Sequence, residues 1–266
     1  MSELRPPPAG RKLILELRRE LKAAGDPERA KGQQAYMKSE MPFWGVKTPE
    51  LRKIGRATFR RHPLDGFEEW RATVLTLWRT AGRREERHAA IDLSGYRAYQ
   101  PLCTMRALPV FEEMIVTGGW WDYVDAVASH RLRELVERCP KTMAKRMVVW
   151  SRCPDMWKRR ASMICQLGRK GSTDLDLLYA TIGENLLESR FGGEFFIRKA
   201  IGWALRDLAW HDPEEVRRFV REREDRLSPL SRREALKNID RAPACDQRRG
   251  PRAGQPARGC HLGAGS

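Results

Sequence analysis

Short stretches of helical periodicity, each ended by a helix-breaking residue, constrain the fold of this chain most. Between residues 13 and 21, four Leu or Ile residues recur at helical spacing, and Gly25 then supplies a stop signal. Asp26 and Pro27 follow as an N-cap and a first-turn proline for the next helix. Sustained alternation of polar and apolar residues and Asn-Gly or Asp-Gly hairpin signals are nearly absent. The sequence therefore predicts an all-α protein.

The spacing of these helices predicts an organisation in repeats. After the first helices, further ones are expected to begin near Arg83, Pro101, Trp120, Lys141, Asp155, Asp174, Glu194, Pro213 and Pro229. Helix pairs then recur at steps of about 35–40 residues, close to the period of HEAT-like solenoid repeats. Such pairs stack into a superhelical solenoid with a concave surface, and an ordinary helical bundle is the alternative.

Composition and helical periodicity divide the chain into three parts. Residues 11–240 are expected to form one domain, with a disordered, Pro-rich N-terminus at residues 1–10. Residues 241–266 are rich in Arg, Gly and Pro and have almost no large apolar side chain, so we expect them to be disordered as well.

The charge of the chain favours a polyanionic partner. Its formal net charge is +16, from 51 Lys and Arg against 35 Asp and Glu. The last 26 residues hold five Arg and one Asp, so the first 240 residues still carry +12. Nucleic acid is the simplest such partner, and a concave, basic solenoid surface would fit a duplex. Codon bias toward Arg in a GC-rich genome is the alternative explanation.

Several other classes of protein are disfavoured. No stretch approaches the roughly 20 apolar residues of a membrane span, and the N-terminus lacks the apolar core of a secretory signal. The six cysteines form no C-x-x-C pair, and the histidines form no metal-binding pattern, so we expect no zinc site. Scattered cysteines are typical of reduced thiols, which predicts a cytoplasmic protein. With a nucleic-acid partner we expect it to be nucleoid-associated, and we expect no membrane partner.

One segment combines tryptophan with carboxylates. Trp121 and Asp125 are four residues apart and share a helix face. Asp122 lies in the first helical turn, where a carboxylate is stabilised by the helix dipole without any further function. The adjacent Trp120 must point in another direction, so we expect Trp120 in the core and leave Trp121 open between packing and exposure.

Two later segments add basic and aromatic residues. Three consecutive cations at residues 158–160 follow a helix start, where they suit phosphate contact, although a solvated charged face is the alternative. On the expected helix beginning near Glu194, Phe196 and Trp203 share a stripe that either packs in the interior or lines a ligand site.

Two indoles, an aspartate and an arginine suffice for one hydrolytic reaction. Cleavage of a glycosidic bond passes through a sugar cation, which a carboxylate stabilises while it orients water. Aromatic faces also stabilise positive charge. An alkylated purine is already positively charged, so it leaves without a general acid and one carboxylate is enough.

These segments together resemble the AlkD-type DNA alkylation-repair glycosylases, which are built from HEAT-like repeats. The resemblance runs from about Arg11 to Asp240 and rests on W-W-D-x-V-D, W-x-x-R and E-F-F-I-x-K-A-I-G-W-x-L-R, with further matches around residues 35–38 and 45–49. It implies a monomeric base-excision-repair enzyme that excises positively charged N3- and N7-alkylated purines from double-stranded DNA. It also implies that the base is not flipped into a pocket, unlike in most glycosylases.

The resemblance further implies a role for individual residues. Asp125 corresponds to the catalytic carboxylate, and Trp121 and Trp203 to aromatic walls against the deoxyribose at the lesion. Arg160 corresponds to the residue that holds the neighbouring DNA backbone. Further members of the DNA-facing groove are expected to be Tyr36, Lys47, Thr48, Arg159 and Arg206.

Two other functions stay open. One is a noncatalytic HEAT-repeat module that binds distorted or branched DNA, and the other is a protein–protein scaffold. Basic charge and fold would look the same in a DNA-binding module, but such a module has no need of the Trp, Asp and Arg set. Retention of that set favours the glycosylase.

Overall fold

The structure is a computed structural model that describes residues 6–237 and 239, and its regular elements in this range are all helical, as predicted. None of the described residues forms a strand. In chain order the elements are α1 (Pro8–Ala23), α2 (Pro27–Met37), α3 (Thr48–Arg61), α4 (Gly66–Arg79), α5 (Arg84–Ser94), η1 (Arg97–Leu102), η2 (Met105–Ala107), α6 (Leu108–Gly118), α7 (Trp121–Ala126), η3 (Val127–Leu132), α8 (Arg133–Arg138), α9 (Pro140–Arg152), α10 (Met156–Ile164), η4 (Lys170–Ser172), α11 (Leu175–Gly183), α12 (Phe195–Ala209), α13 (Pro213–Glu222) and α14 (Pro229–Leu236).

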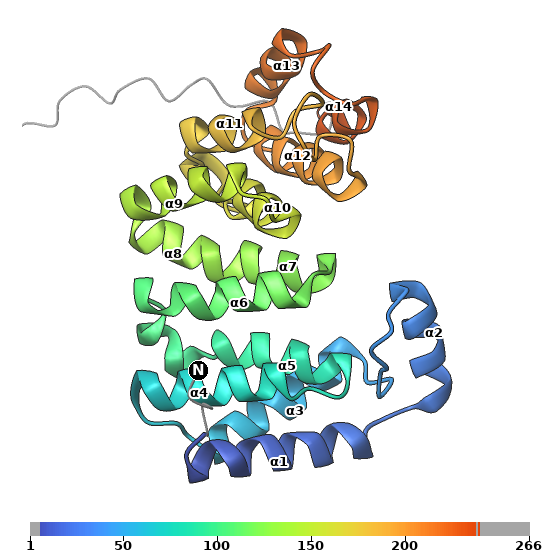
Figure 1. The fold of residues 1–266 in the computed structure, drawn as a ribbon, viewed down its shortest axis with the longest axis vertical. Helices are drawn as coiled ribbons and strands as arrows, with labels where there is room; N and C mark the ends of the chain where they lie inside the picture. The colour runs from blue at the N-terminus through green and yellow to red at the C-terminus, as the bar shows by residue number, and fades with distance from the viewer. Residues whose placement is uncertain (1–5, 238, 240–266) are drawn as a thin grey trace, which may run out of the picture.

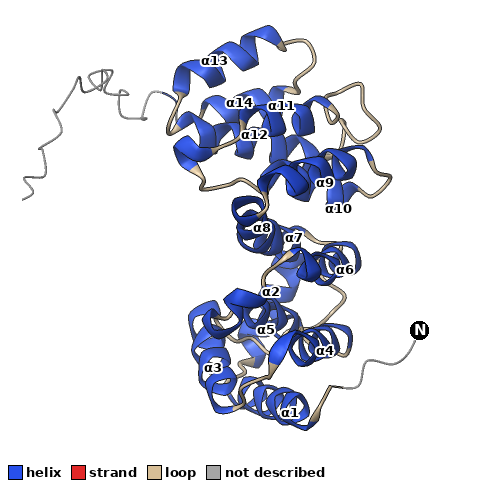
Figure 2. Ribbon diagram, turned by 90° about the vertical axis from the view of Figure 1, so that its left-hand side faces the viewer, coloured by secondary structure: helices blue, strands red, loops and turns tan. Residues whose placement is uncertain are grey.

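The helices stack as antiparallel pairs along the long axis of the molecule (Figures 1 and 2). In one row α3, α5, α7, α10 and α12 pack in succession. Each later member of this row also packs against a partner, α4 with α5, α6 with α7, α9 with α10 and α13 with α12. This arrangement is the predicted superhelical solenoid, in which each pair buries its apolar face against its neighbours.

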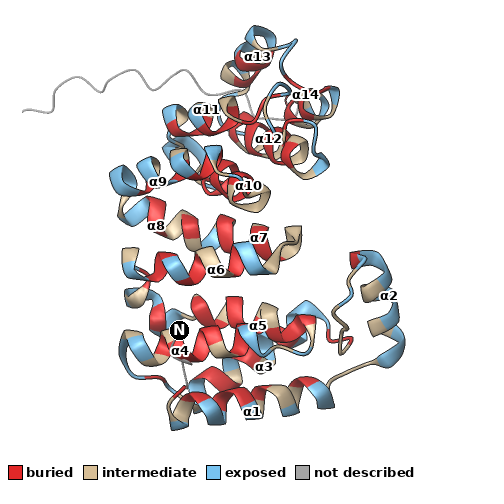
Figure 3. Cartoon of the chain, viewed as in Figure 1, coloured by how far each residue is buried: buried red, intermediate tan, exposed pale blue. Residues whose placement is uncertain are grey.

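A single hydrophobic core runs through the stack from Leu13 to Ile239. Figure 3 shows the buried positions along the inward faces of the stacked helices. Helix α2 is the exception, because Met37 is its only buried residue and the helix stands beside the stack (Figure 1). Among the described residues, no helix is both long and apolar enough to cross a membrane.

Most helix starts follow from capping signals in the sequence. Side-chain oxygens of Asp26, Asp155, Asp174, Asp212 and Ser228 accept hydrogen bonds from backbone amides in the first turns of α2, α10, α11, α13 and α14. These bonds satisfy amides that have no partner within their own helix. The expected helix starts at these positions are therefore confirmed.

Two boundaries differ from the prediction. The helix expected near Pro101 begins instead at Leu108, where Pro109 occupies the first turn, and Pro101 lies inside the 3₁₀ segment η1. Helix α1 begins at Pro8, so the prediction of disorder is wrong for residues 8–10. Gly10 packs so closely on α4 that an added Cβ would lie 2.2 Å from Thr73 Oγ1. The predicted tail at residues 241–266 lies outside the described residues.

A buried carboxylate fixes the loop that precedes α3. Glu85 is 2% exposed and accepts hydrogen bonds from the three backbone amides of residues 44–46, at 2.9, 2.8 and 3.1 Å. Gly45 has a φ of +87°, and a Cβ there would lie 2.0 Å from the carbonyl oxygen of Asp26. Glycine is therefore required by conformation and by space, and the anchored loop sets Lys47 and Thr48 at the start of α3.

A second buried charge joins α5 to α7. Arg84 is 5% exposed and donates to both carboxylate oxygens of Asp122, at 2.6 and 2.7 Å. His88 Nε2 lies 2.9 Å from Asp122 Oδ2. Burial alone would raise the pKa of Asp122, but the hydrogen bonds and charges of His88 and Arg84 outweigh burial and lower that pKa.

Removal of this carboxylate is expected to destabilise the fold. Asp122→Ala leaves Arg84 buried without its counter-charge, which should lower the free energy of unfolding by about 3–5 kcal/mol in urea denaturation at neutral pH. Because the pKa of Asp122 is lower in the folded state, the stabilisation is lost as pH falls through that folded pKa. Glu28→Ala is the control, since Glu28 and Lys31 form an exposed pair and should cost under about 1 kcal/mol. Equal losses in the two variants would contradict this account.

Candidate functional site

The amino ends of four helices meet on one side of the stack. Arg84 and Asp122 join the start of α5 to the start of α7. The rings of Trp120, Trp157 and Phe196, at the starts of α7, α10 and α12, pack with centroids 6.2, 5.5 and 5.1 Å apart. A helix N-terminus carries free amides and partial positive charge, so four of them together favour an anion. In Figure 1 this is the side on which α2 lies.

Asp125 lies one turn into α7 and forms a bidentate ion pair with Arg160 of α10. Arg160 Nε and Nη2 donate to the two carboxylate oxygens at 2.7 and 2.8 Å. The third guanidinium nitrogen, Nη1, donates to the backbone carbonyl oxygen of Phe196. The side chains of Arg160 and Asp125 are only 5% and 13% exposed. Arg160 therefore connects α7, α10 and α12 and fixes the orientation of the Asp125 carboxylate.

The pKa values of the two carboxylates of α7 are shifted in opposite directions. Burial raises the pKa of Asp125, even though the Arg160 guanidinium acts to lower it. The pKa of Asp122, three residues earlier, is lowered by its two basic partners. Environments that push the pKa values of neighbouring acids apart are typical of sites in which only one acid is chemically active. Asp122 is the carboxylate that fixes α7 against α5, and Asp125 is the one whose pKa is raised by burial.

The helix that carries Asp125 changes its winding directly after this residue. Helix α7 ends at Ala126 and continues without a break into η3, which is a π-helix, and then into α8. Ser129 Oγ donates to the backbone carbonyl oxygen of Asp125 at 2.6 Å. A π-helical turn inside an α-helix is rare and often marks a functional site. Here it changes the register between the face that carries Asp125 and the buried positions of α8.

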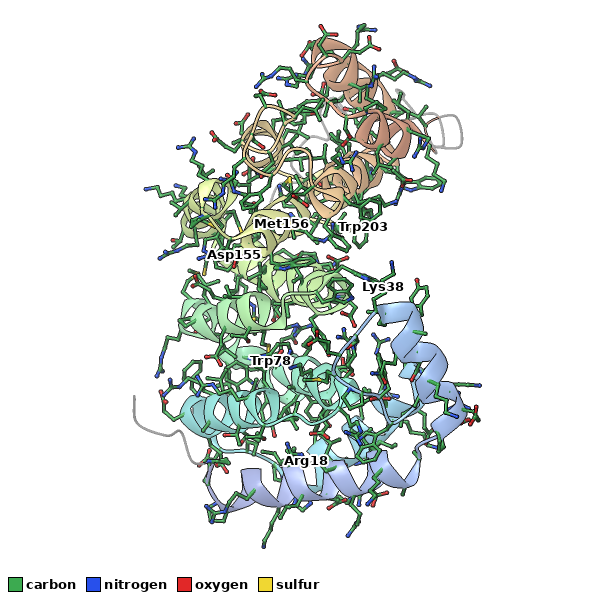
Figure 4. All side chains as sticks on the ribbon, turned by 45° about the vertical axis from the view of Figure 1, so that its right-hand side comes forward. Arg18, Lys38, Trp78, Asp155, Met156 and Trp203 are labelled. Carbon is green, nitrogen blue, oxygen red and sulfur yellow. The ribbon has the colours of Figure 1, made fainter. Side chains whose placement is uncertain are left out.

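The predicted aromatic residues are divided between packing and the site. Trp120, expected in the core, packs on Trp157 and Phe196 and is only partly buried against the core, whereas Trp121 is half-buried and outside the hydrophobic core of the described residues. Trp203 is partly buried on α12, seven residues after Phe196 and so on the same helix face. Figure 4 shows Trp203 on the side of the molecule where Lys38 ends α2.

A cavity of about 350 Å³ adjoins α7 on the side of α2. Among its lining residues are Tyr36 of α2, Thr48 of α3, and Asp122 and Ala126 of α7. Tyr36 is 77% exposed, and Lys47 beside Thr48 is exposed as well. The structure therefore brings three predicted DNA-facing residues to one region next to the helix that carries Asp125.

Three predicted phosphate contacts are engaged within the protein. Arg159 is 7% exposed and donates to the carbonyl oxygens of residues 152, 153 and 184, so the structure does not support a DNA contact by this side chain. Arg206 forms an ion pair with Glu234 of α14. Arg160 holds Asp125, as described above, and its predicted contact with the DNA backbone stays a prediction.

Sequence reasoning missed the partners of Asp122. The signal was present, because Arg84 and His88 are four residues apart and so share one face of α5. It also missed Phe196 as the acceptor for Arg160, which no pattern reveals because the contact uses a backbone oxygen.

Among the described residues, no group of three His, Cys, Asp or Glu side chains is placed to hold a metal ion.

Comparison with known proteins agrees with this architecture. The sequence model of the family described as "DNA alkylation repair enzyme" matches residues 17–239. A solved structure described as "Predicted DNA alkylation repair enzyme from Enterococcus faecalis" is similar to this chain with a TM-score of 0.71 and 28% sequence identity, over 82% of this chain and 98% of the other. No curated protein matches the chain. Since the family match spans most of its length, the chain belongs to the DNA alkylation repair enzyme family.

Proposed function

We propose that this protein is a DNA glycosylase that hydrolyses the N-glycosidic bond of positively charged N3- and N7-alkylated purines in duplex DNA, without flipping the base. The observation that carries the proposal is the placement of the Asp125 carboxylate where four helix N-termini meet. Arg160 fixes the orientation of this carboxylate, and burial raises its pKa. The enzyme would act as a monomer on cytoplasmic, nucleoid DNA and without a metal or cofactor.

The chemistry follows from how the bond breaks. When the C1′–N bond of an alkylated purine breaks, its electron pair neutralises the purine, and positive charge develops on the sugar. A buried carboxylate, whose charge water does not screen, interacts strongly with a cation that forms beside it, so it lowers the energy of the transition state more than that of the substrate. Water then adds to C1′ and loses a proton. Asp125 would stabilise the cation and orient this water.

Arg160 and the two tryptophans complete this mechanism. Because Arg160 donates to both oxygens, the Asp125 carboxylate does not rotate away from the sugar. Preorganisation of this kind avoids a reorganisation cost during the reaction. The indole faces of Trp121 and Trp203 would pack against the deoxyribose and add quadrupole stabilisation of the positive charge.

Duplex binding is supported by charge and by helix orientation. The starts of α5, α7, α10 and α12 favour phosphate oxygens, and the exposed Tyr36, Lys47 and Thr48 lie close to the same helix row. Contacts of this type position the duplex without reading its sequence. That property suits an enzyme whose target is a chemical lesion.

The role of Asp125 is tested by Asp125→Asn. The amide is close to isosteric but uncharged, so we expect release of 7-methylguanine from methylated duplex DNA to fall by about 100-fold or more. Binding to a duplex with an abasic site should remain largely intact. Release at the wild-type rate would overturn the assignment, and wild-type protein that binds DNA but releases no purine would favour a noncatalytic DNA-binding module.

The acid limb of the pH–rate profile tests the ion pair. The reaction needs ionised Asp125, so the rate falls as pH decreases through its folded-state pKa, which burial raises. Arg160→Gln removes the guanidinium that lowers this pKa, so the acid limb should move to higher pH in single-turnover excision. Arg160→Lys keeps a positive charge and should move it less. An unchanged acid limb in Arg160→Gln, with the fold intact by circular dichroism, would contradict the proposed coupling.

A further inference from the structure

The exposed face of α9 concentrates positive charge away from the site described above. Lys141, Lys145 and Arg146 are all exposed, and in the part of the chain that the structure describes none of them forms an ion pair. Together with Thr142 and Val149 they surround an open hollow of about 520 Å³. In Figure 1, α9 lies on the left of the stack and α2 on the right.

The neighbouring helices show that this concentration is local. Residues 140–152 of α9 hold four Lys or Arg and no carboxylate. Of the helices that pack on α9, α11 has Asp176 with no cation, and α8 has two Arg and two Glu that pair with each other or their neighbours. Helix α10 has three cations, but each of them is engaged by a carboxylate or a backbone carbonyl oxygen. The unpaired charge on the exposed face of α9 is therefore not shared by the helices packed against it.

Other cations close to α9 are neutralised by carboxylates. Arg152, at the end of the same helix, pairs with Glu184 at 3.0 Å. Arg138, just before the helix, pairs with Glu134 at 2.8 Å. Three adjacent exposed cations without such a partner repel one another, and an anionic ligand would relieve that repulsion.

The spacing of these cations fits a row of phosphates. Lys141 and Lys145 are four residues apart and so lie one above the other on the helix surface, with Arg146 beside them. The first turn of α9, which starts at Pro140, adds free backbone amides and partial positive charge next to Lys141 and Thr142. Side chains and helix end thus favour the same kind of ligand.

We propose that this α9 face is a second nucleic-acid surface, which binds the backbone of another duplex segment while the first site holds its own DNA. A protein partner fits less well, because lysine is depleted and aromatic residues are enriched in protein–protein interfaces. Around the hollow Val149, at 59% exposure, is the only large apolar side chain, and no aromatic ring lines it. Phosphate contacts are made by Lys, Arg and Thr side chains.

The placement of the two surfaces gives the proposal a consequence. Because α9 and α2 lie on opposite sides of the stack, one molecule has room to hold two duplex segments at once (Figure 1). Such a protein passes from one segment to the next without complete release. This property does not depend on the proposed glycosylase reaction, so its test uses binding alone.

The test is a bridging assay with the full chain. An abasic-site duplex is immobilised, the protein is added, and capture of a second, fluorescent undamaged duplex is measured. Wild-type protein should capture the second duplex. The triple variant Lys141→Glu, Lys145→Glu, Arg146→Glu should reduce capture by about tenfold or more, because log affinity falls with each lost phosphate contact, while retention on the first duplex changes far less.

A matched variant separates position from total charge. Lys12→Glu, Lys22→Glu, Arg221→Glu changes the net charge equally at exposed sites on α1 and α13, and it should keep bridging. Lys141→Arg, Lys145→Arg should keep it as well. Unchanged bridging in the α9 triple variant, or equal loss in the two triple variants, would overturn the proposal. It would also be overturned if polyglutamate bound this face and DNA did not.

Discussion

The buried ion pair between Asp125 and Arg160 is the interaction on which the site depends. Removal of both charges from water is unfavourable, and it is offset here by bidentate geometry and by the additional bond from Arg160 to the carbonyl of Phe196. The pair also links helices from successive repeats. Since repeats of a solenoid contact only their neighbours, a bond of this kind makes the position of the carboxylate a property of the stack rather than of one helix.

The second carboxylate of α7 has different partners from Asp125. Asp122 is held by Arg84 and His88, which lowers its pKa and fixes α7 against α5. With α7 fixed on that side, Asp125 faces α10, where burial raises its pKa. The pKa values of two acids within one helical turn are thus shifted in opposite directions, and the surroundings of each acid cause the difference.

The sequence predicted most of the fold because helix starts are local. Caps such as Asp155 and Asp174 act within one turn, so they are readable without a structure. The contacts within the candidate site were harder to predict from the sequence. Arg159 and Arg160 are adjacent and chemically identical, yet the turn between them directs one toward backbone carbonyls of neighbouring segments and the other toward Asp125. The partner that decides this lies 35 residues away, beyond any local pattern, and the sequence accordingly led to the same prediction of DNA contact for both arginines.

In the same way, net charge locates a binding surface only after the charges already paired within the protein are set aside. Arg159 and Arg206 lie in segments that the sequence singles out, but their charges are used inside the protein. On the side of the site, the partial positive charge of helix N-termini, which carry no formal charge, adds to the attraction for phosphate. Three exposed cations of α9, Lys141, Lys145 and Arg146, in contrast, have no carboxylate partner among the described residues. A surface for an anion is therefore sought among exposed cations that the fold leaves without a carboxylate partner, and the three on α9 stand together around one hollow.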